Sequence, residues 1–303
     1  MIEKNKPFYH FINLCTYWLY LIVRKKMKKN TATDKEDQPI WITGLFRSGT
    51  SLTTRILSTL GVDLGPEDHL LKAKGSRESL NPDGFQENYL FMDWSLKVFR
   101  DLEGWGHAPP SHSSVEAYEN EIDDKAFAYH SIVDVHDDRI SNVKKLKALR
   151  NNSPTNFESY LLESFKPPFA IKNPHFSILF PLLQRQWANS KFLVVFRNPN
   201  DTIASAKKVA PTADYSLYFE YYSRLLESDL DAIYFSYDAL IDHPEKSIKA
   251  LALALKLDAS GAEQAVRLVN PKRSGNKGTT KGDWPQSIQF VYDEMNKWAI
   301  NRE

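Results

Sequence analysis

The sequence has little cysteine and almost no net charge, and each shortage excludes a class of function. Cys15 is the only cysteine among 303 residues, so the chain has neither a disulfide framework nor a cysteine-based metal site. The 39 lysine and arginine residues nearly balance the 38 aspartate and glutamate residues, which leaves a formal net charge of +1. A chain without a strong overall field is not expected to bind nucleic acid, and an anion site must come from local basic residues.

The N-terminus lacks the small-residue cleavage site that a secretory signal peptide carries after its apolar stretch. Residues 7–23 carry no formal charge and are rich in aromatic and aliphatic side chains, and basic residues fill most of positions 24–29. This pattern is typical of a helix that lies in the membrane interface or spans it, and a terminal helix packed on its own domain is the alternative. We expect residues 7–29 to bind a membrane surface. The rest of the chain is then expected in the cytoplasm or at the cytoplasmic face of the membrane.

After the apolar helix and polar linker expected over residues 1–38, the pattern changes to alternating strands and helices. Apolar segments bounded by turn residues predict strands at 40–44, 168–172, 191–196 and 232–237. Helical periodicity predicts helices near 50–60, 87–100, 115–150, 177–187, 200–208, 214–229, 244–256 and 286–298. The alternation favours an α/β fold with a central parallel sheet flanked by helices. Ligands of such sheets bind beyond the carboxyl ends of the strands, which would bring together 44–51, 172–175 and 197–205.

Residues 44–51 read Gly-Leu-Phe-Arg-Ser-Gly-Thr-Ser, between a predicted strand and a predicted helix. This order predicts a phosphate cradle, in which successive backbone N–H groups surround an anion at a helix N-terminus. The lysine of a nucleotide-triphosphate P-loop is missing, since Thr50 occupies its position and the cation inside the loop is Arg47. The loop therefore suits a phosphate-like group but is not built for ATP hydrolysis.

A second anion motif begins where the predicted strand 191–196 ends. Arg197-Asn-Pro follows the strand, and Ser205 lies about two helical turns further on. Both side chains can therefore face one anion. Arginine offers a planar fork to a phosphate group, and a serine hydroxyl adds one donor.

Together, the loop Gly44–Ser51 and the pair Arg197 and Ser205 resemble the sulfotransferase family, which uses 3′-phosphoadenosine 5′-phosphosulfate (PAPS). The segments Leu64–Asp68 and Asn81–Glu87 are similar to those of bacterial and Golgi-type members. The resemblance implies a P-loop-like sulfotransferase fold, within a domain that we place at residues 39–303. It also implies transfer of the sulfuryl group from PAPS to a hydroxyl of a glycan, a lipid or a small molecule.

The resemblance also assigns the residues that bind the cofactor. The first loop would hold the 5′-phosphosulfate, Arg197 and Ser205 would hold the 3′-phosphate, and Tyr237 would lie against the adenine. Lys277 and Gly278 belong to a segment similar to the closing segment of the cytosolic enzymes, although it is one residue longer. The full set is Gly44, Arg47, Ser48, Gly49, Thr50, Ser51, Arg197, Ser205, Tyr237, Lys277 and Gly278.

Sulfuryl transfer places its own demands on the catalytic residues. Cations and N–H donors must face the leaving phosphate, because it gains charge, and Arg47 and Lys172 are the candidates. A general base must take the proton of the acceptor hydroxyl. Glu87, which follows the Asn-Pro-Asp-Gly turn, Glu67, which follows the first helix, and His175, which follows Lys172, all stay open as that base.

Two other functions stay open at this point. One is a P-loop nucleotide or small-molecule kinase, against which Thr50 in the lysine position argues, and the other is a nucleotide-binding protein without catalysis. No metal is expected, because His136 points away from the helix face that Asp134 and Asp138 share. The acceptor is expected to be selected by the loops 62–85 and 104–155.

Overall fold

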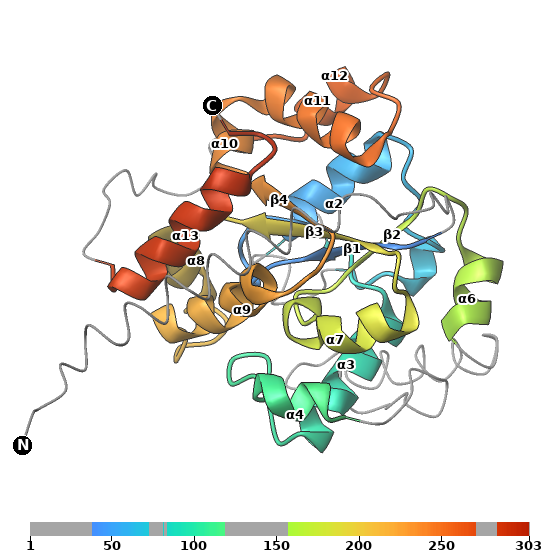
Figure 1. The fold of residues 1–303 in the computed structure, drawn as a ribbon. Helices are drawn as coiled ribbons and strands as arrows, with labels where there is room; N and C mark the ends of the chain where they lie inside the picture. Colours follow the sequence, from blue (N-terminus) through green and yellow to red (C-terminus); the bar gives the residue numbers. More distant parts are fainter. Residues whose placement is uncertain (1–37, 73–80, 82–83, 119–156, 271–283, 303) are drawn as a thin grey trace, which may run out of the picture.

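The computed structural model of the chain describes residues 38–72, 81, 84–118, 157–270 and 284–302 (Figure 1). The expected membrane segment 7–29, the charged stretch 134–138, and both Lys277 and Gly278 lie outside the described residues.

Four parallel strands form the central sheet, as the sequence predicts. They are β1 (Ile40–Thr43), β2 (Ala170–Lys172), β3 (Lys191–Phe196) and β4 (Ala232–Ser236), arranged in the order β2-β1-β3-β4. Trp41 of β1 pairs with Ile171 on one side and with Phe192 on the other. All residues of β1 and β2 are buried, and burial on both faces explains why these strands are almost continuously apolar.

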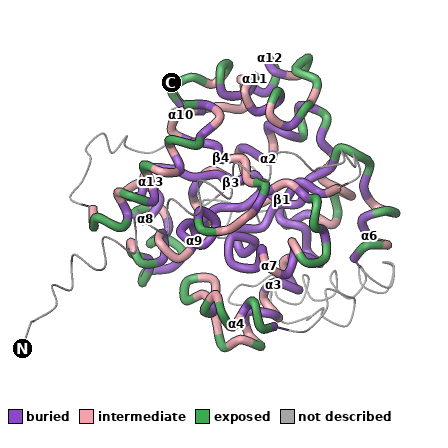
Figure 2. Tube along the Cα trace, viewed as in Figure 1, coloured by how far each residue is buried: buried purple, intermediate pink, exposed green. Residues whose placement is uncertain are grey.

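Helices cover both faces of the sheet (Figure 1). Because side chains alternate along a strand, Ile42 and Leu193 pack in one cluster, whereas Trp41 and Phe192 pack in the other. The first cluster is completed by α2 (Thr50–Thr59), α10 (Tyr237–Asp242), α11 (Pro244–Leu255) and α12 (Ala262–Val266). The second is completed by α3 (Tyr89–Asp101), α4 (His112–Glu116), α6 (Phe157–Ser164), α7 (Phe176–Gln186), α8 (Pro199–Ala206), α9 (Tyr215–Glu227) and α13 (Gln286–Trp298). Figure 2 shows the strands and α9 as mostly buried, while α11 and α12 expose their outer surfaces.

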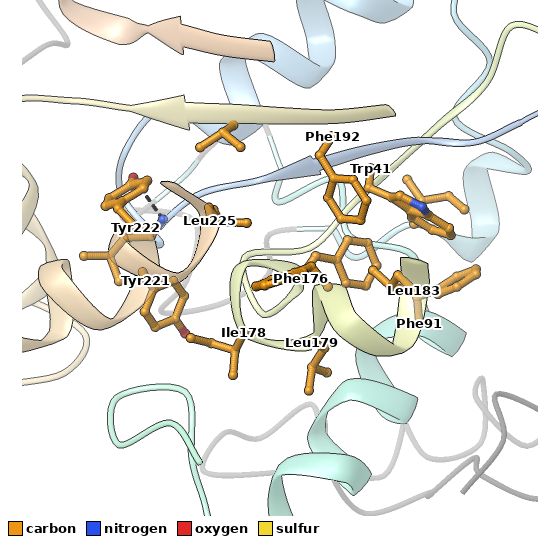
Figure 3. Packing of buried hydrophobic residues seen from close by; sticks show 14 of the residues in the cluster. Trp41, Phe91, Phe176, Ile178, Leu179, Leu183, Phe192, Tyr221, Tyr222 and Leu225 are labelled. Carbon is orange, nitrogen blue, oxygen red and sulfur yellow. Dashed lines mark hydrogen bonds between the residues drawn. The ribbon is translucent and has the colours of Figure 1, made fainter. Parts of the chain in front are cut away.

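Aromatic side chains make up much of the second cluster (Figure 3). The ring of Trp41 lies 5.6 Å from that of Phe91, 5.2 Å from that of Phe176 and 5.1 Å from that of Trp187, between centroids. Its indole N–H donates to the hydroxyl of Ser190 (2.8 Å). Each such pair adds about 0.5–1.5 kcal/mol beyond the burial of its area. These contacts therefore stabilise the packing on this face of the sheet.

Two of the differences from the sequence-based boundaries have a clear cause in side-chain contacts, and α6 and α12 were not predicted. Tyr237, predicted as the end of a strand, begins α10, because the Ser236 hydroxyl accepts from the Ala239 N–H (3.2 Å) and starts a helix there. The start predicted for the helix 115–150 is also wrong, since α4 ends at Glu116. Arg185 donates to the carbonyl oxygens of Glu116 (3.0 Å) and Tyr118 (3.2 Å), which a continuing helix would need for its own hydrogen bonds.

Candidate active site

The site lies at the carboxyl edge of the sheet, where four strand ends bring the predicted residues side by side. β2 ends at Lys172, β1 leads into Gly44, β3 leads into Arg197 and β4 leads into Tyr237. The strand order β2-β1-β3-β4 therefore sets the order of these residues along the edge. This edge is where parallel sheets generally bind ligands.

The loop between β1 and α2 takes its shape from contacts with α9 and β3. The Leu45 N–H donates to the Tyr222 hydroxyl (3.0 Å), and the Ser48 hydroxyl donates to the Val195 carbonyl oxygen (3.0 Å). Tyr222 donates to the same carbonyl oxygen (3.0 Å), and burial raises the pKa of its phenol, which keeps it protonated. Gly44 has a φ of 141°, and a Cβ there would lie 2.1 Å from the Val195 carbonyl oxygen. Only glycine fits where the loop leaves the strand.

Tyr237 touches both predicted anion motifs. Gly49, just before α2, has a φ of 99°, and a Cβ there would lie 2.1 Å from the Tyr237 ring. The Arg197 guanidinium lies over the same ring, with Cζ 5.1 Å from the centroid. Tyr237 is thus packed against the loop backbone and lies against Arg197. The aromatic face attracts the positive charge of the guanidinium.

Arg47 and Arg197 converge at this edge. Arg47 adopts a left-handed backbone conformation (φ 74°), which is uncommon for a non-glycine residue and collects at functional sites. Its Nε donates to the Ser205 hydroxyl (3.0 Å), across 158 positions of the chain. Burial, and then the charge of Arg197, lowers the pKa of Arg47. Asp201 neutralises part of the Arg197 charge through an ion pair of 3.1 Å.

The N-terminus of α2 adds to this positive end. Its first turn contains no acidic side chain. Gly49 at the cap position has no side chain that could accept a hydrogen bond from the first N–H groups. The first N–H groups of a helix have no partner inside the helix, and the helix dipole is positive there. With Arg47 and Arg197 beside it, this end fits a ligand that carries phosphate or sulfate groups.

Lys172 and Glu87 form a buried ion pair at the neighbouring strand end. The Lys172 ammonium also donates to the Phe85 carbonyl oxygen (2.9 Å) and to the Ser51 hydroxyl (3.2 Å). The ammonium is therefore tied to the first turn of α2. Burial lowers the pKa of Lys172 against the effect of Glu87, and the charge of Arg47 lowers it further.

The two other candidate bases lie in different surroundings. Glu67 belongs to a short 3₁₀ helix, Glu67–His69, and its largely exposed carboxylate pairs with Lys72 (2.6 Å). His175 precedes α7 and is almost fully buried, with Nδ1 3.0 Å from the Ser95 hydroxyl. Burial, and then the charge of Lys172, lowers the pKa of His175 to about 4. Its imidazole is therefore neutral near pH 7.

The predicted closing segment is described only from Trp284 onward. The Trp284 indole N–H donates to the side-chain oxygen of Asn200 (2.9 Å), which also accepts from the Tyr215 hydroxyl. Asn200 lies in the first turn of α8, the helix that carries Ser205. The chain following residue 283 therefore starts beside the second anion motif.

Several residues of the site carry no sequence signal. Tyr222 is one of several tyrosines on α9, and nothing in its neighbours indicates that it holds the loop. The same applies to Asp238, whose half-buried carboxylate accepts from the Asn198 N–H (2.6 Å) and from the Tyr292 hydroxyl (3.3 Å). Burial raises the pKa of Asp238. Both residues act through tertiary contacts, which sequence spacing does not encode.

Comparison with known proteins identifies the family. The Sulfotransferase family model matches residues 39–260, and the chain belongs to the sulfotransferase family. The predicted family and the predicted parallel α/β sheet are thereby confirmed. No curated protein matches the chain.

The solved structures that are similar to this chain include two mycobacterial sulfotransferases. The sulfotransferase STF1 from Mycobacterium tuberculosis H37Rv shares 13% identity over 85% of this chain and 76% of that chain, with a TM-score of 0.37. The sulfotransferase STF9 from Mycobacterium avium shares 12% identity over 87% of this chain and 77% of that chain, with a TM-score of 0.39.

Two features are absent from the described residues. None of their helices has the length and apolar character needed to cross a bilayer. In the same part of the chain, no group of three or more His, Cys, Asp or Glu side chains is arranged to hold a metal ion.

Proposed function

We propose that this protein transfers the sulfuryl group of PAPS to an acceptor hydroxyl. Family membership supports sulfotransferase activity. The identity of the donor, PAPS, is part of our proposal. The proposal assigns the 5′-phosphosulfate to residues 44–51, the 3′-phosphate to Arg197 and Ser205, and the adenine to Tyr237. Lys277 and Gly278 are proposed as additional contacts of the 3′-phosphate.

One observation carries the proposal: Arg47 and Arg197 lie within electrostatic reach of each other at the uncapped N-terminus of α2. Two cations that repel each other are stabilised by an anion bound between or beside them. Ser205 joins the two motifs, because it accepts from Arg47 and follows Arg197 on the next helix. A ligand with phosphate groups at two positions of one nucleotide suits such a divided site.

The bound cofactor supplies the sulfuryl group, and the chain supplies charge and orientation. Arg47 and the N–H groups of Gly49–Ser51 stabilise the negative charge that gathers on the leaving phosphate oxygens. The Ser48 N–H donates to the Leu45 carbonyl oxygen instead (3.1 Å). Lys172 is held beside the same turn by Ser51, so its ammonium reaches the charge that develops during transfer.

Glu87 is the base that we favour, because its carboxylate is held by Lys172 next to the transfer centre. His175 is the second candidate. Its imidazole is neutral and therefore able to accept a proton, and it lies close enough to Lys172 for that charge to lower its pKa. Glu67 is the third, because its exposed carboxylate is paired with Lys72.

We further propose that residues 1–38 form a membrane-attached segment and linker, and that residues 39–303 form the sulfotransferase domain on the cytoplasmic side. The acceptor is then a hydroxyl-bearing glycan, lipid or small molecule that reaches this face.

The test combines a binding assay with a transfer assay. Adenosine 3′,5′-bisphosphate without metal should raise the melting temperature, because a ligand at about 100 times its Kd stabilises the fold by about 2.7 kcal/mol. ATP with Mg²⁺ should not match it. Radiolabelled sulfate should pass from PAPS to an acceptor in a panel of glycans, lipids and phenols. Stabilisation by ATP with Mg²⁺ alone would indicate a kinase, and bisphosphate binding without transfer to any acceptor would indicate a binding protein.

A further inference from the structure

Two carboxylates lie close to Arg197, the cation assigned to the 3′-phosphate. Nη2 of Arg197 is 3.1 Å from Oδ2 of Asp201, and both side chains are mostly buried, with 10% and 16% of their surface exposed. Asp238 is near as well, because burial raises the pKa of its carboxyl and the charge of Arg197 lowers it. The positive charge at the end of β3 is therefore largely balanced by the chain itself.

The two carboxylates differ in what else they contact. Asp238 accepts from the Asn198 N–H and from the Tyr292 hydroxyl, so it joins separate parts of the fold. Within the described part of the chain, the Asp201 carboxylate has a hydrogen bond or ion pair with Arg197 alone. Asp201 is in the first turn of α8, where the helix dipole favours an acid, but the cap of that helix is Asn198. The dipole accounts for an acid at this position, and the ion pair directs its charge to Arg197.

Other contacts hold the Arg197 guanidinium in place. Its Cζ lies 5.1 Å from the centroid of the Tyr237 ring, and the whole residue is buried. The Arg197 carbonyl oxygen accepts from the Tyr218 hydroxyl (3.0 Å), which fixes the backbone. An uncharged side chain at position 201 therefore leaves this cation where it is. Since a guanidinium has five N–H donors in a fixed fork, it can bind a phosphate while it stays paired with Asp201.

Asp201 and a bound 3′-phosphate would share this one cation. Two negative charges so close repel each other, and water screens the repulsion less where the groups are mostly buried. The 3′-phosphate itself is unchanged by sulfuryl transfer, so its contacts are equally strong before, during and after the reaction. Such uniform binding does not speed the chemical step. It does determine how long the spent cofactor stays bound, and product release limits the turnover of many enzymes.

We propose that Asp201 is a positioning residue that acts through Arg197 to limit the affinity for the 3′-phosphate, and that it thereby speeds release of the spent cofactor. This inference rests on the proposed function, which assigns the 3′-phosphate to Arg197. It adds a residue whose charge opposes ligand binding, so its removal should tighten binding. A residue with a purely structural role would have the opposite effect, because its loss loosens the site.

The experiment measures binding of adenosine 3′,5′-bisphosphate and adenosine 5′-monophosphate by calorimetry, and bisphosphate dissociation by stopped flow. Asp201→Asn keeps an oxygen that can accept from Arg197 and removes the charge. It should bind the bisphosphate about tenfold more tightly and release it about tenfold more slowly, with the monophosphate affinity unchanged. Asp201→Glu keeps the charge and should behave like the wild type. Glu263→Gln, at an exposed acid of α12 beside the far end of α2, is the control for net charge and should also behave like the wild type.

The outcomes separate this proposal from the proposed function. If the wild type prefers the bisphosphate but Asp201→Asn binds it equally or more weakly, the proposed function stands and the role of Asp201 is overturned. The role is also overturned if Asp201→Asn binds both nucleotides more tightly by the same factor, or if Asp201→Glu tightens binding as Asp201→Asn does. A wild type that binds the two nucleotides equally contradicts the proposed function, and the role of Asp201 with it.

Discussion

Arg47 has two unfavourable features, and an anionic ligand can relieve one of them. Its backbone is left-handed, and its guanidinium is partly buried and lies close enough to Arg197 for the two charges to repel. Each raises the free energy of the empty site, and a bound phosphate oxygen offsets the second directly. Ser205 keeps the guanidinium in place meanwhile, so the site is organised before the ligand arrives. Pre-placed charge of this kind acts on the transition state without further rearrangement.

Replacing Arg47 or Lys172 by alanine should lower kcat much more than it weakens binding of the spent cofactor, adenosine 3′,5′-bisphosphate. Both cations are assigned to charge that develops during transfer, so most of their effect belongs to the transition state. Steady-state kinetics and calorimetry on each variant measure the two quantities. A rise in KM alone would mean that the residue only positions the cofactor. Since Lys172→Ala leaves Glu87 buried without its partner, Lys172→Met combined with Glu87→Gln serves as the control for folding.

His175 should make stability depend on pH. Its pKa is lowered to about 4 in the folded chain, against roughly 6.5 in the unfolded chain. The unfolded chain therefore binds more protons between these values, and the free energy of unfolding falls as the pH drops below about 6.5. Between about pH 7.5 and pH 5 this loss is about 2 kcal/mol.

Urea unfolding of wild type and His175→Asn at the two pH values measures this loss. The variant should lose less stability on acidification, by about that amount. An equal loss in both proteins would show that His175 titrates normally in the folded chain.

At the residue scale, the sequence predicted which side chains gather but not how they pair. Glu67 and Glu87 are both candidate bases in the sequence, and only the fold shows that Glu87 pairs with Lys172 whereas Glu67 pairs with Lys72. Ser205 was expected beside Arg197, and its described contact is with Arg47. These pairings depend on distances between separate strands, which no local pattern carries.

At the scale of elements, the loop between β1 and α2 depends on Tyr237 as much as on its own sequence. The ring of Tyr237, the first residue of α10, occupies the space that a side chain on Gly49 would need. The cradle is therefore an assembly of β1, α2 and α10, and its shape is sensitive to a single methyl group at position 49.

Gly49→Ala should abolish bisphosphate binding and destabilise the fold more than Gly61→Ala does. Both glycines have similar φ values, 99° and 87°, but a Cβ on Gly61 meets nothing within 4 Å. Gly61→Ala therefore measures the backbone strain alone, about 1 kcal/mol. The additional loss in Gly49→Ala, read from urea unfolding, reports the clash with Tyr237. Equal stability losses in the two variants, with binding retained, would show that Tyr237 moves aside at no cost.

Elements with strong apolar periodicity were predictable, and several of the shortest helices were not. The strands and α2, α3, α7, α8, α9, α11 and α13 appear close to their predicted positions, whereas α6 and α12 had no predicted counterpart. α10 was missed because a serine cap interrupts an apolar run that continues the strand pattern. The end of α4 was missed because Arg185, a tertiary partner, takes the carbonyl oxygens.

At the scale of the whole molecule, the two halves of the sheet contribute different residues to the site. The β2 and β1 ends supply Lys172 and the cradle, and the β3 and β4 ends supply Arg197 and Tyr237. The proposed catalytic domain begins at residue 39, just before β1, and follows the segment proposed to meet the membrane.

Deleting residues 1–30 should release the protein from membranes and leave a folded domain that binds bisphosphate. Apolar aromatic residues and a basic flank provide the two attractions that stable anchoring requires. Membrane fractionation, with high-salt and detergent washes of the full chain, separates a surface anchor from a span. A full-length protein in the soluble fraction, together with a truncated form that aggregates, would show that the segment packs on its own domain.

The central claim, that Arg197 and Ser205 hold a 3′-phosphate, is tested most directly by the preference for that phosphate. Calorimetry should compare adenosine 3′,5′-bisphosphate with adenosine 5′-monophosphate in the wild type, in Arg197→Ala and in Arg267→Ala, which removes an exposed arginine on another helix end. A charged hydrogen bond contributes about 1.5–3 kcal/mol. The wild type and Arg267→Ala should therefore prefer the bisphosphate by at least about tenfold, and Arg197→Ala should lose that preference while its affinity for the monophosphate changes little. Equal affinity of the wild type for the two nucleotides would contradict the account.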